Sequence, residues 1–294
     1  MKDKGTAAPE ELRFVKMNPS GNTTLLILDH VSRERQPAAA AILATPEYLA
    51  VDQVGYLEEP KDAGAKVRLQ MMGGEFCGNA TRAVAAYLLA RGDVSGKEEI
   101  MLEVSGSDTL VEARAERRSD RQWWTEAAVP VPQAVRTEEI SFGGSTIAAV
   151  YVTFPGIDHL VLEGIEPSFE AYAELDRRGF LPRGEAARGV MFWNRKAGTL
   201  TPLVAVGTGE PIREGSCGSG SVAVAAAMAL ASGRSVHDMT LRQPLGEILV
   251  TAERGRQGIT RAVIKGTVDM IATGTVLLPP GDAITAGGYT APER

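Results

Sequence analysis

The stretch EFCGNATRAVAA at residues 75–86 is nearly repeated by GSCGSGSVAVAA at residues 215–226, and each copy holds one of the chain's two cysteines. In register, Cys77 matches Cys217, Gly78 matches Gly218, and the same Ala-Val-Ala-Ala run follows. The likeness continues downstream, where LVEAR at residues 110–114 corresponds to LVTAE at residues 249–253. The repeat predicts a duplicated domain in which one thiol from each half faces a shared cleft.

Two alanine-rich segments and many short β-like runs surround these motifs. Residues 80–91, and the segment from Cys217 to about Gly233, have the composition of helices that are buried on most faces. Further helices are predicted near residues 37–44 and 167–175. Two segments with strand character are predicted on either side of a turn at residues 18–22. Further strands are predicted at residues 53–57, 66–71, 98–104, 109–115, 147–154, 190–193, 247–252, 262–268 and 270–278. The chain is therefore expected to be an α+β protein with two similar lobes, each around a central helix.

Pro130 and Pro132 interrupt any regular pattern between residues 127 and 141, since proline disrupts helices and central strands. The crossing between the halves is predicted there. The N-terminal lobe would span residues 1–131 with Cys77, joined by the last strand at about 270–294, and the C-terminal lobe would span 132–269 with Cys217. The tail after Pro280 is expected to be weakly ordered.

Composition narrows the class of protein. The 294 residues are 44% hydrophobic and 23% charged, as in a folded globular protein of two ordinary domains. The net charge of −6, with both signs interleaved, disfavours a nucleic-acid partner. No apolar run approaches the roughly 20 residues that span a bilayer, and the N-terminus lacks the apolar core of a signal peptide. We expect no membrane partner and a cytoplasmic protein with reduced thiols. The sequence leaves open whether the protein forms a homodimer.

A cysteine that precedes glycine and a helix suits acid–base chemistry. Unpaired N–H groups at a helix N-terminus favour a thiolate and can also bind a carboxylate. Racemisation needs a base on one face of a carbon and an acid on the other, which two equivalent thiols provide. A Cys–His nucleophile fits less well, because only His30, His159 and His237 are present and a repeat gives no reason for two nucleophiles. The alternative interpretation is that both cysteines are buried and contribute only to the packing of the core.

Other sites find little support in the sequence. The spacing of the cysteines excludes a redox CxxC site, and the chain lacks the grouped cysteine and histidine ligands of a zinc site. No glycine-rich dinucleotide or phosphate fingerprint is present. We therefore predict neither a metal nor another cofactor.

At these motifs the chain resembles the diaminopimelate epimerase superfamily, the cofactor-independent two-cysteine racemases. The resemblance covers nearly the full length and includes Gly21-Asn22, Asp52-Gln53, CGN at residues 77–79 and CGSG at residues 217–220. The phrases NPSGN, QVG, EFCGNAT, SCGSG and IKG are similar to those of one subgroup, the histidine racemases of staphylopine-type metallophore pathways.

The resemblance implies two pseudo-symmetric lobes, each a curved, mainly antiparallel sheet around a central helix, that close on an amino acid. It implies that Cys77 and Cys217 are the acid/base pair and that no cofactor takes part. The substrate contacts that it implies are Asn22, Asp52, Gln53, Gly78, Asn79, His159, Glu214, Gly218, Ser219 and Gly220. Among these, the backbone from Gly78 and from Gly218 to Gly220 would hold the α-carboxylate, and Asp52 or Glu214 would meet an imidazole or the α-amino group.

The chain departs from diaminopimelate epimerases where those enzymes hold their substrate. Thr208 and Gly209 replace a Glu-Arg pair, Met191 replaces an asparagine, and Ile157-Asp158-His159 replaces an Asn-Pro-His element. The loss of these polar groups penalises diaminopimelate in a dry pocket. Histidine racemisation is thus the first hypothesis, diaminopimelate epimerisation an alternative, and a non-catalytic amino-acid-binding protein on the same scaffold another.

Overall fold

The computed structural model describes residues 9–96, 98–182 and 187–279, so the tail after Pro280 lies outside the described residues. The helices are α1 (Gln36–Leu43), α2 (Gly78–Arg91), α3 (Phe169–Arg177) and α4 (Gly218–Ser232). The first strands are β1 (Glu10–Pro19), β2 (Thr24–Ile27), β3 (Gln53–Glu58), β4 (Arg68–Met71), β5 (Ile100–Val104), β6 (Val111–Arg117) and β7 (Gln122–Val129). The remaining strands are β8 (Ala134–Phe142), β9 (Ser145–Phe154), β10 (Ile157–Glu163), β11 (Ala187–Asn194), β12 (Thr199–Val206), β13 (Ile212–Arg213), β14 (Val236–Gln243), β15 (Gly246–Arg254) and β16 (Ile259–Leu278).

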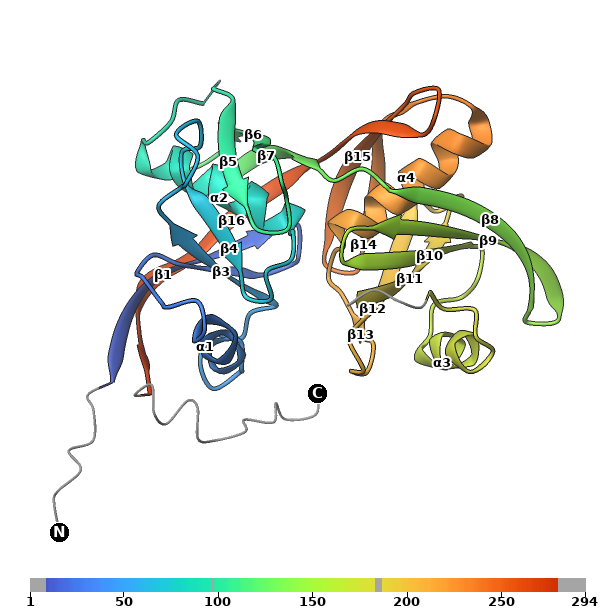
Figure 1. Ribbon diagram of the computed structural model, residues 1–294, viewed down its shortest axis with the longest axis horizontal. Helices are drawn as coiled ribbons and strands as arrows, with labels where there is room; N and C mark the ends of the chain where they lie inside the picture. The colour runs from blue at the N-terminus through green and yellow to red at the C-terminus, as the bar shows by residue number, and fades with distance from the viewer. Residues whose placement is uncertain (1–8, 97, 183–186, 280–294) are drawn as a thin grey trace, which may run out of the picture.

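The protein is mostly sheet, and the seven strands of its first half form a closed eight-stranded barrel together with β16. The strands follow the order β1-β2-β3-β4-β5-β6-β7-β16, and pairing between β1 and β16 closes the ring. Helix α2 lies inside these strands (Figure 1). The sheet then continues through β15-β14-β12-β11-β10-β9-β8, which surround α4 on the other side of the molecule. Parallel pairs occur at β2–β3, β4–β5, β10–β11 and β12–β14, and the other pairs are antiparallel.

Strand β16 belongs to both sets of strands. Its first part pairs with β15 and β7, and its second part, from Val268 to Leu278, pairs with β1. Figure 1 shows it crossing from one side of the molecule to the other. Residues 130–133, which include both prolines, form the other crossing, between β7 and β8.

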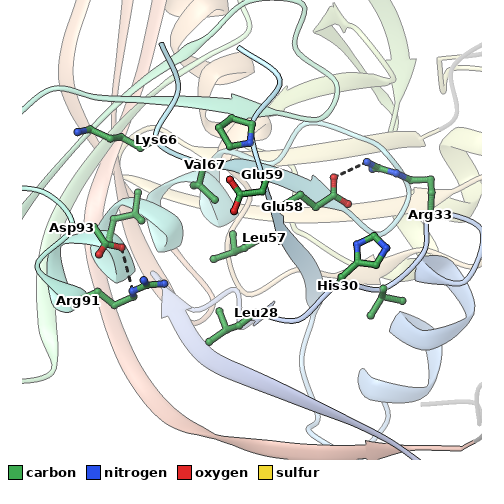
Figure 2. Close-up of a pocket in the computed structure, with 13 residues that line it drawn as sticks. Leu28, His30, Arg33, Leu57, Glu58, Glu59, Lys66, Val67, Arg91 and Asp93 are labelled. Carbon is green, nitrogen blue, oxygen red and sulfur yellow. Dashed lines mark hydrogen bonds and ion pairs between the residues drawn. The ribbon is translucent and has the colours of Figure 1, made fainter. Parts of the chain in front are cut away.

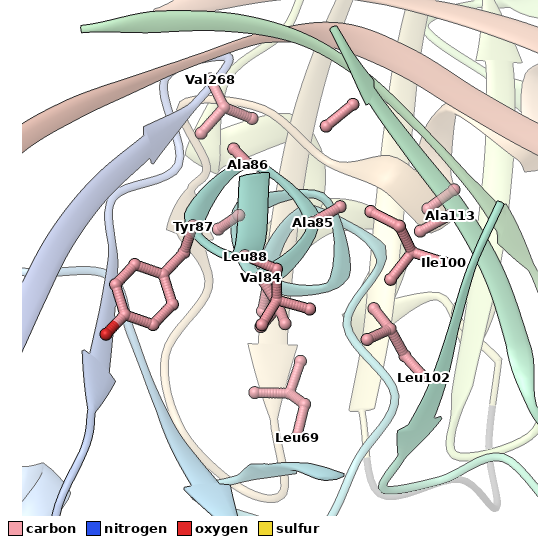
Figure 3. Close-up of a cluster of buried hydrophobic side chains, with 14 of the residues drawn as sticks. Leu69, Val84, Ala85, Ala86, Tyr87, Leu88, Ile100, Leu102, Ala113 and Val268 are labelled. Carbon is pink, nitrogen blue, oxygen red and sulfur yellow. The ribbon is translucent and has the colours of Figure 1, made fainter. Parts of the chain in front are cut away.

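Helices α2 and α4 each lie at the centre of a hydrophobic cluster. Around α2 the cluster includes Leu69, Val84, Leu88, Leu102 and Val268, so apolar side chains contact the helix from strands on several sides (Figure 3). The corresponding cluster of α4 includes strand residues from β9 to β16. Alanine-rich helices permit this arrangement because small side chains let strands approach on every face. The composition of the two helices thus explains why each can be enclosed by sheet.

The elements predicted around the repeat are confirmed, with shifted ends. Residues 110–114 and 249–253 lie at or beside β6 and within β15, each two positions after the corresponding helix in the order of elements. The predicted break between residues 268 and 270 is wrong, because β16 continues through Asp269, whose carboxylate accepts a hydrogen bond from the Gln122 side chain at 2.9 Å. Strands β7, β8, β10, β12, β13 and β14 were not among the predicted strands. Within the described ranges, no helix has the length and apolar character needed to cross a membrane.

Candidate functional site

Both cysteines are the N-cap residues of the central helices. Cys77 (φ −133°, ψ 109°) accepts the N–H of Ala80 at 3.3 Å, and Cys217 (φ −122°, ψ 114°) accepts the N–H of Gly220 at 3.4 Å. The hydroxyl four residues after each cysteine, of Thr81 or Ser221, donates to that cysteine's carbonyl oxygen. The repeat in sequence is therefore also a repeat of local structure, with each sulfur over the first turn of its helix.

The two motifs meet at the crossing strand β16. A Cβ atom on Gly78 would lie 2.7 Å from the Cδ1 atom of Ile264, and one on Gly218 would lie 3.0 Å from that same atom. Asn79, the second residue of α2, donates its amide hydrogens to the carbonyl oxygen and the hydroxyl of Ser216 at 3.3 and 3.4 Å. The N-termini of α2 and α4 are thus adjacent, although 140 residues separate the two cysteines in sequence.

Cys77 and Cys217 have different polar partners. The thiol of Cys77 donates to the side-chain oxygen of Gln53 on β3 at 2.7 Å. The sulfur of Cys217 lies 3.6 Å from the Ser219 hydroxyl, which in turn lies 2.8 Å from Nε2 of His159 on β10. The two halves therefore support equivalent sulfurs with different side chains.

Burial dominates the electrostatics of both thiols. Cys77 is 9% exposed and Cys217 is 6% exposed. Loss of solvent raises the pKa of Cys77 to about 12, although the Ala80 N–H lowers it, and the carboxylates of Glu75 and Glu214 raise it further. Burial also raises the pKa of Cys217 well above its usual value, again with a contribution from Glu214. The N–H groups at the helix N-termini lower the pKa of both thiols, as the sequence predicts, but burial raises it by more.

Two carboxylates lie at the site. Glu214, three residues before Cys217, is half-buried, and burial followed by the charge of Asp52 raises its pKa to about 7, while its contact with Cys217 lowers it. Asp52 is exposed and accepts both the N–H and the hydroxyl of Thr23, at 2.8 and 2.7 Å. The charge of Glu214 raises the pKa of both thiols, and the charge of Asp52 raises the pKa of Glu214. These four groups therefore interact electrostatically.

A network of buried polar side chains joins the barrel to the Cys217 loop; we call Ser20, Asn22, Asn79, Arg82 and Ser216 the Arg82 network. Arg82 on α2 donates to the Asn79 side-chain oxygen at 2.8 Å and to the Ser20 hydroxyl at 3.3 Å. Asn22 donates to the carbonyl oxygen of Ser216 at 3.2 Å. Each of the five residues is buried.

The structure brings the predicted site residues into this region through three kinds of contact. Gln53, His159 and Ser219 lie in the hydrogen-bond environment of the sulfurs. Asn22, Gly78, Asn79 and Gly218 lie where α2 meets the Cys217 loop. Asp52 and Glu214 supply charge, and Gly220 supplies an N–H to Cys217. His159 is fully buried, and this burial lowers its pKa to about 3, so its ring is neutral.

Sequence reasoning missed Arg82, Ser216 and Gln243. The Gln243 side chain accepts the N–H of Cys217 at 2.8 Å and donates to the Ser221 hydroxyl at 2.9 Å. The burial of Arg82 could have been predicted, because this residue lies within an alanine-rich helix that is expected to be buried on every face. Ser216 and Gln243 gave no such signal.

At Met191, Thr208 and Gly209, where this chain differs from diaminopimelate epimerases, the residue is either apolar and buried or exposed to solvent. Met191 is fully buried, and its sulfur packs directly against Gly220 in the first turn of α4. Thr208 and Gly209 lie in an exposed turn after β12. A thioether therefore contacts the helix at the position where those enzymes have an amide.

A groove lies away from the two cysteines. It has a volume of about 640 Å³ and is lined by residues that include His30, Arg33, Glu58, Lys66 and Arg91, beside the C-terminal end of α2 (Figure 2). Arg33 pairs with Glu58 there, and Arg91 pairs with Asp93. Neither cysteine lines this groove. In the part of the chain that the structure describes, no three histidine, cysteine or acidic side chains are grouped as they would be to hold a metal ion.

Comparisons with known proteins show the family of the chain and proteins of similar fold. A family model described as "Histidine racemase CntK N-terminal domain" matches residues 11–277. The chain is 29% identical over 273 residues to the histidine racemase of Fusobacterium nucleatum subsp. nucleatum (strain ATCC 23726), covering 91% of this chain and 97% of that one. It is 28% identical to the histidine racemase of Staphylococcus aureus (strain Mu50), covering 90% and 96%. Its fold is similar to that of a probable proline racemase from Agrobacterium radiobacter K84, with a TM-score of 0.68 at 14% identity and coverage of 95% and 96%.

Proposed function

Because this chain belongs to the histidine racemase CntK N-terminal domain family, we propose that it is a cofactor-independent isomerase that interconverts L- and D-histidine. The observation that carries the mechanism is the pair of equivalent N-cap cysteines on adjacent helix N-termini. In this proposal one sulfur removes the α-proton as a thiolate. The other sulfur, as a thiol, delivers a proton to the opposite face of the same carbon.

The helix N-termini would hold the α-carboxylate. Backbone N–H groups of the first turns of α2 and α4 are oriented as an anion site, and Gly78 and Gly218 carry no side chain that would block approach. As the α-proton leaves, negative charge spreads onto the carboxylate, so the same N–H groups stabilise the transition state more than the ground state. Binding and catalysis would therefore use one set of donors.

Asp52 and Glu214 would recognise the cationic groups of histidine. A carboxylate beside the thiols raises their pKa in the free protein, and a bound ammonium or imidazolium would offset that charge. Neutral Met191 and exposed Thr208 provide no equivalent for the distal charged end of diaminopimelate. The two carboxylates thus favour histidine, and the absence of a partner at Met191 and Thr208 for a distal charged group disfavours diaminopimelate.

We further propose that the barrel and the strands around α4 act as two lobes that open for substrate. Both thiols are buried, so an amino acid can reach them only if α2 and α4 separate at their N-termini. The two crossings, residues 130–133 and β16, are the places at which such a movement would bend the chain. This proposal retains the division at residue 131 that the sequence predicts.

The substrate assignment is tested by chiral chromatography of purified protein incubated with single L-amino acids and with LL-diaminopimelate. We expect D-histidine to form, at a far higher rate than any other product. Racemisation of another amino acid without histidine would refute the substrate. Binding of histidine without any racemisation would indicate a binding protein instead.

A further inference from the structure

Arg82 is a buried cation beside the proposed acid/base pair. Its side chain is 0% exposed, and its hydrogen-bond partners among the described residues are the Asn79 side-chain oxygen and the Ser20 hydroxyl, both uncharged. Burial lowers the pKa of Arg82 to about 10, and Cys77 is the group whose charge opposes this. Burying a guanidinium without a carboxylate is costly, so this arrangement calls for a reason other than stability.

Arg82 and Ser216 hold opposite ends of the Asn79 amide. A guanidinium only donates hydrogen bonds, so it must meet the oxygen end of the amide. The NH2 end is then directed to Ser216, where it donates to the carbonyl oxygen and the hydroxyl at 3.3 and 3.4 Å. Without Arg82 the Asn79 oxygen would lose this donor, and the amide would be held only through its NH2 end at Ser216.

The Ser216 carbonyl belongs to the peptide that leads into Cys217. Asn79 from α2 and Asn22 from the loop after β1 both donate to this one oxygen. Holding it fixes the backbone of Cys217 relative to the helix that begins at Cys77. The contact therefore bears directly on how far apart the two sulfurs lie.

The barrel wall holds Arg82 in place. A Cβ atom on Gly266 of β16 would lie 2.7 Å from Nη1 of Arg82 and 2.6 Å from the Ser20 hydroxyl. Only a glycine leaves room for the guanidinium at this point. Ser20 also donates to the carbonyl oxygen of Thr267, which completes a rigid support from the strand that both halves share.

We propose that Arg82 is a positioning residue that acts through Asn79 to hold the Ser216 carbonyl and thereby sets the separation of the Cys77 and Cys217 sulfurs. The kinetic consequence rests on the proposed racemase function, whereas the separation itself can be measured without it. Arg82 fixes the side chain of Asn79, which fixes the carbonyl oxygen of Ser216. That carbonyl belongs to the peptide that positions Cys217.

The separation is tested by the rate at which a mild oxidant such as diamide forms a Cys77–Cys217 disulfide in the folded full chain, followed by mass spectrometry. The alkylation rate of each thiol by iodoacetamide, measured in parallel, corrects for changes in thiolate content. We expect Arg82→Met to slow the corrected rate about tenfold or more. Arg91→Met, on an exposed arginine of the same helix, is the matched control and should leave it unchanged. An unchanged rate in Arg82→Met would overturn the proposal.

Action through Asn79 is tested by a double-mutant cycle. If Arg82 works through that amide, Arg82→Met combined with Asn79→Ala should have the same corrected disulfide rate as Asn79→Ala alone. Multiplicative slowing in the double variant would show that Arg82 acts independently and would contradict the inference. Circular dichroism and thermal unfolding confirm that each variant is folded. If Arg82→Met does not fold, Arg82→Lys, which keeps the charge but lacks the planar fork, takes its place and should show the same pattern more weakly.

The kinetic readout separates positioning from a merely structural role. We expect kcat for histidine to fall about tenfold or more in Arg82→Met while KM changes less than about threefold, because the proton transfers depend on placement and binding does so less. A rise in KM alone would contradict the inference. If the unaltered protein does not racemise any amino acid, the proposed function fails, and the disulfide measurement still decides the role of Arg82.

Discussion

At the scale of single residues, the proposed mechanism requires two buried thiols to hold opposite protonation states. Burial raises the pKa of both, and Glu214 raises both further. The free protein therefore favours two neutral thiols, and in the proposed mechanism the charge of the substrate would favour formation of a thiolate. Substrate binding and activation of the base are then a single event.

Replacing Glu214 tests this electrostatic coupling. In Glu214→Gln the charge that raises the pKa of both thiols is gone, so alkylation of Cys77 and of Cys217 by iodoacetamide should reach its midpoint at lower pH. Peptide mass spectrometry resolves the two sites. Glu75→Gln is the matched control, because Glu75 acts on Cys77 and should shift that thiol alone. Unchanged midpoints in Glu214→Gln would show that this carboxylate does not act on the site.

His159 links the stability of the protein to pH. Its pKa in the folded protein is about 3, below the ordinary value of about 6.5, so on acidification the unfolded chain binds the proton first. Its contribution is full above pH 6.5 and is lost as the pH falls toward 3, by up to about 1.4 kcal/mol per pH unit. Urea unfolding between pH 7 and pH 4 should therefore show a shallower decline in His159→Gln than in the unaltered protein. Parallel curves would contradict a neutral buried imidazole.

At the scale of elements, the site is where two helices begin. Each cysteine caps its helix, and the glycine that follows brings the two helix ends against Ile264 of β16. The packing is tight enough that an added methyl group at Gly78 would lie 2.7 Å from Ile264 and 2.8 Å from Val129. The glycines are thus needed for the approach of the two halves as well as for access to the backbone.

Gly78→Ala should therefore overpack the junction. We expect a loss of about 1–3 kcal/mol in the free energy of unfolding, together with reduced racemisation. Ile264→Val removes the Cδ1 atom that the new methyl group would meet, so the double variant should recover part of the activity. Urea denaturation and racemisation assays of both single variants and the double variant measure these effects. A Gly78→Ala protein with full stability and activity would show that the junction can relax.

Local sequence was enough to predict the elements that carry the chemistry. The alanine-rich helices and their cysteine caps follow from short-range pattern, and so do the strands beside them. Strand β7 was missed because WWTEAAV lacks a clean alternation, and β16 was divided because Asp269 reads as a break unless its partner Gln122 is known. The Arg82 network could not be predicted, since Asn22 and Ser216 are 194 residues apart in sequence and no local rule brings them together.

At the scale of the whole molecule, one continuous sheet encloses both helices, and β16 belongs to both sets of strands. The glycines at residues 21, 215 and 246 bring backbone from the two sides into direct contact, where any side chain would collide with main-chain atoms. This seam lies beside the Arg82 network. Close packing and buried hydrogen bonds thus join the two sides of the molecule, and the proposed opening would have to break both. The division into lobes and a homodimer both stay predictions.

Closure implies that the protein is sensitive to oxidation. If the two sulfurs approach one carbon, mild peroxide should join Cys77 to Cys217 and abolish activity, and dithiothreitol should restore it. Mass spectrometry of the unreduced protein identifies the linked peptides. Activity that survives peroxide, or loss that a reductant does not reverse, would count against a close pair.

The central claim is that two different groups exchange protons with opposite faces of one carbon, and isotope distribution in heavy water tests it most directly. L-histidine is incubated in deuterium oxide, the reaction is stopped after a few per cent of conversion, and the α-position of each enantiomer is analysed by mass spectrometry. We expect D-histidine to carry deuterium while the remaining L-histidine still carries protium. D-histidine that retains the original protium would mean that a single group moves the proton from face to face, which would contradict the two-thiol mechanism.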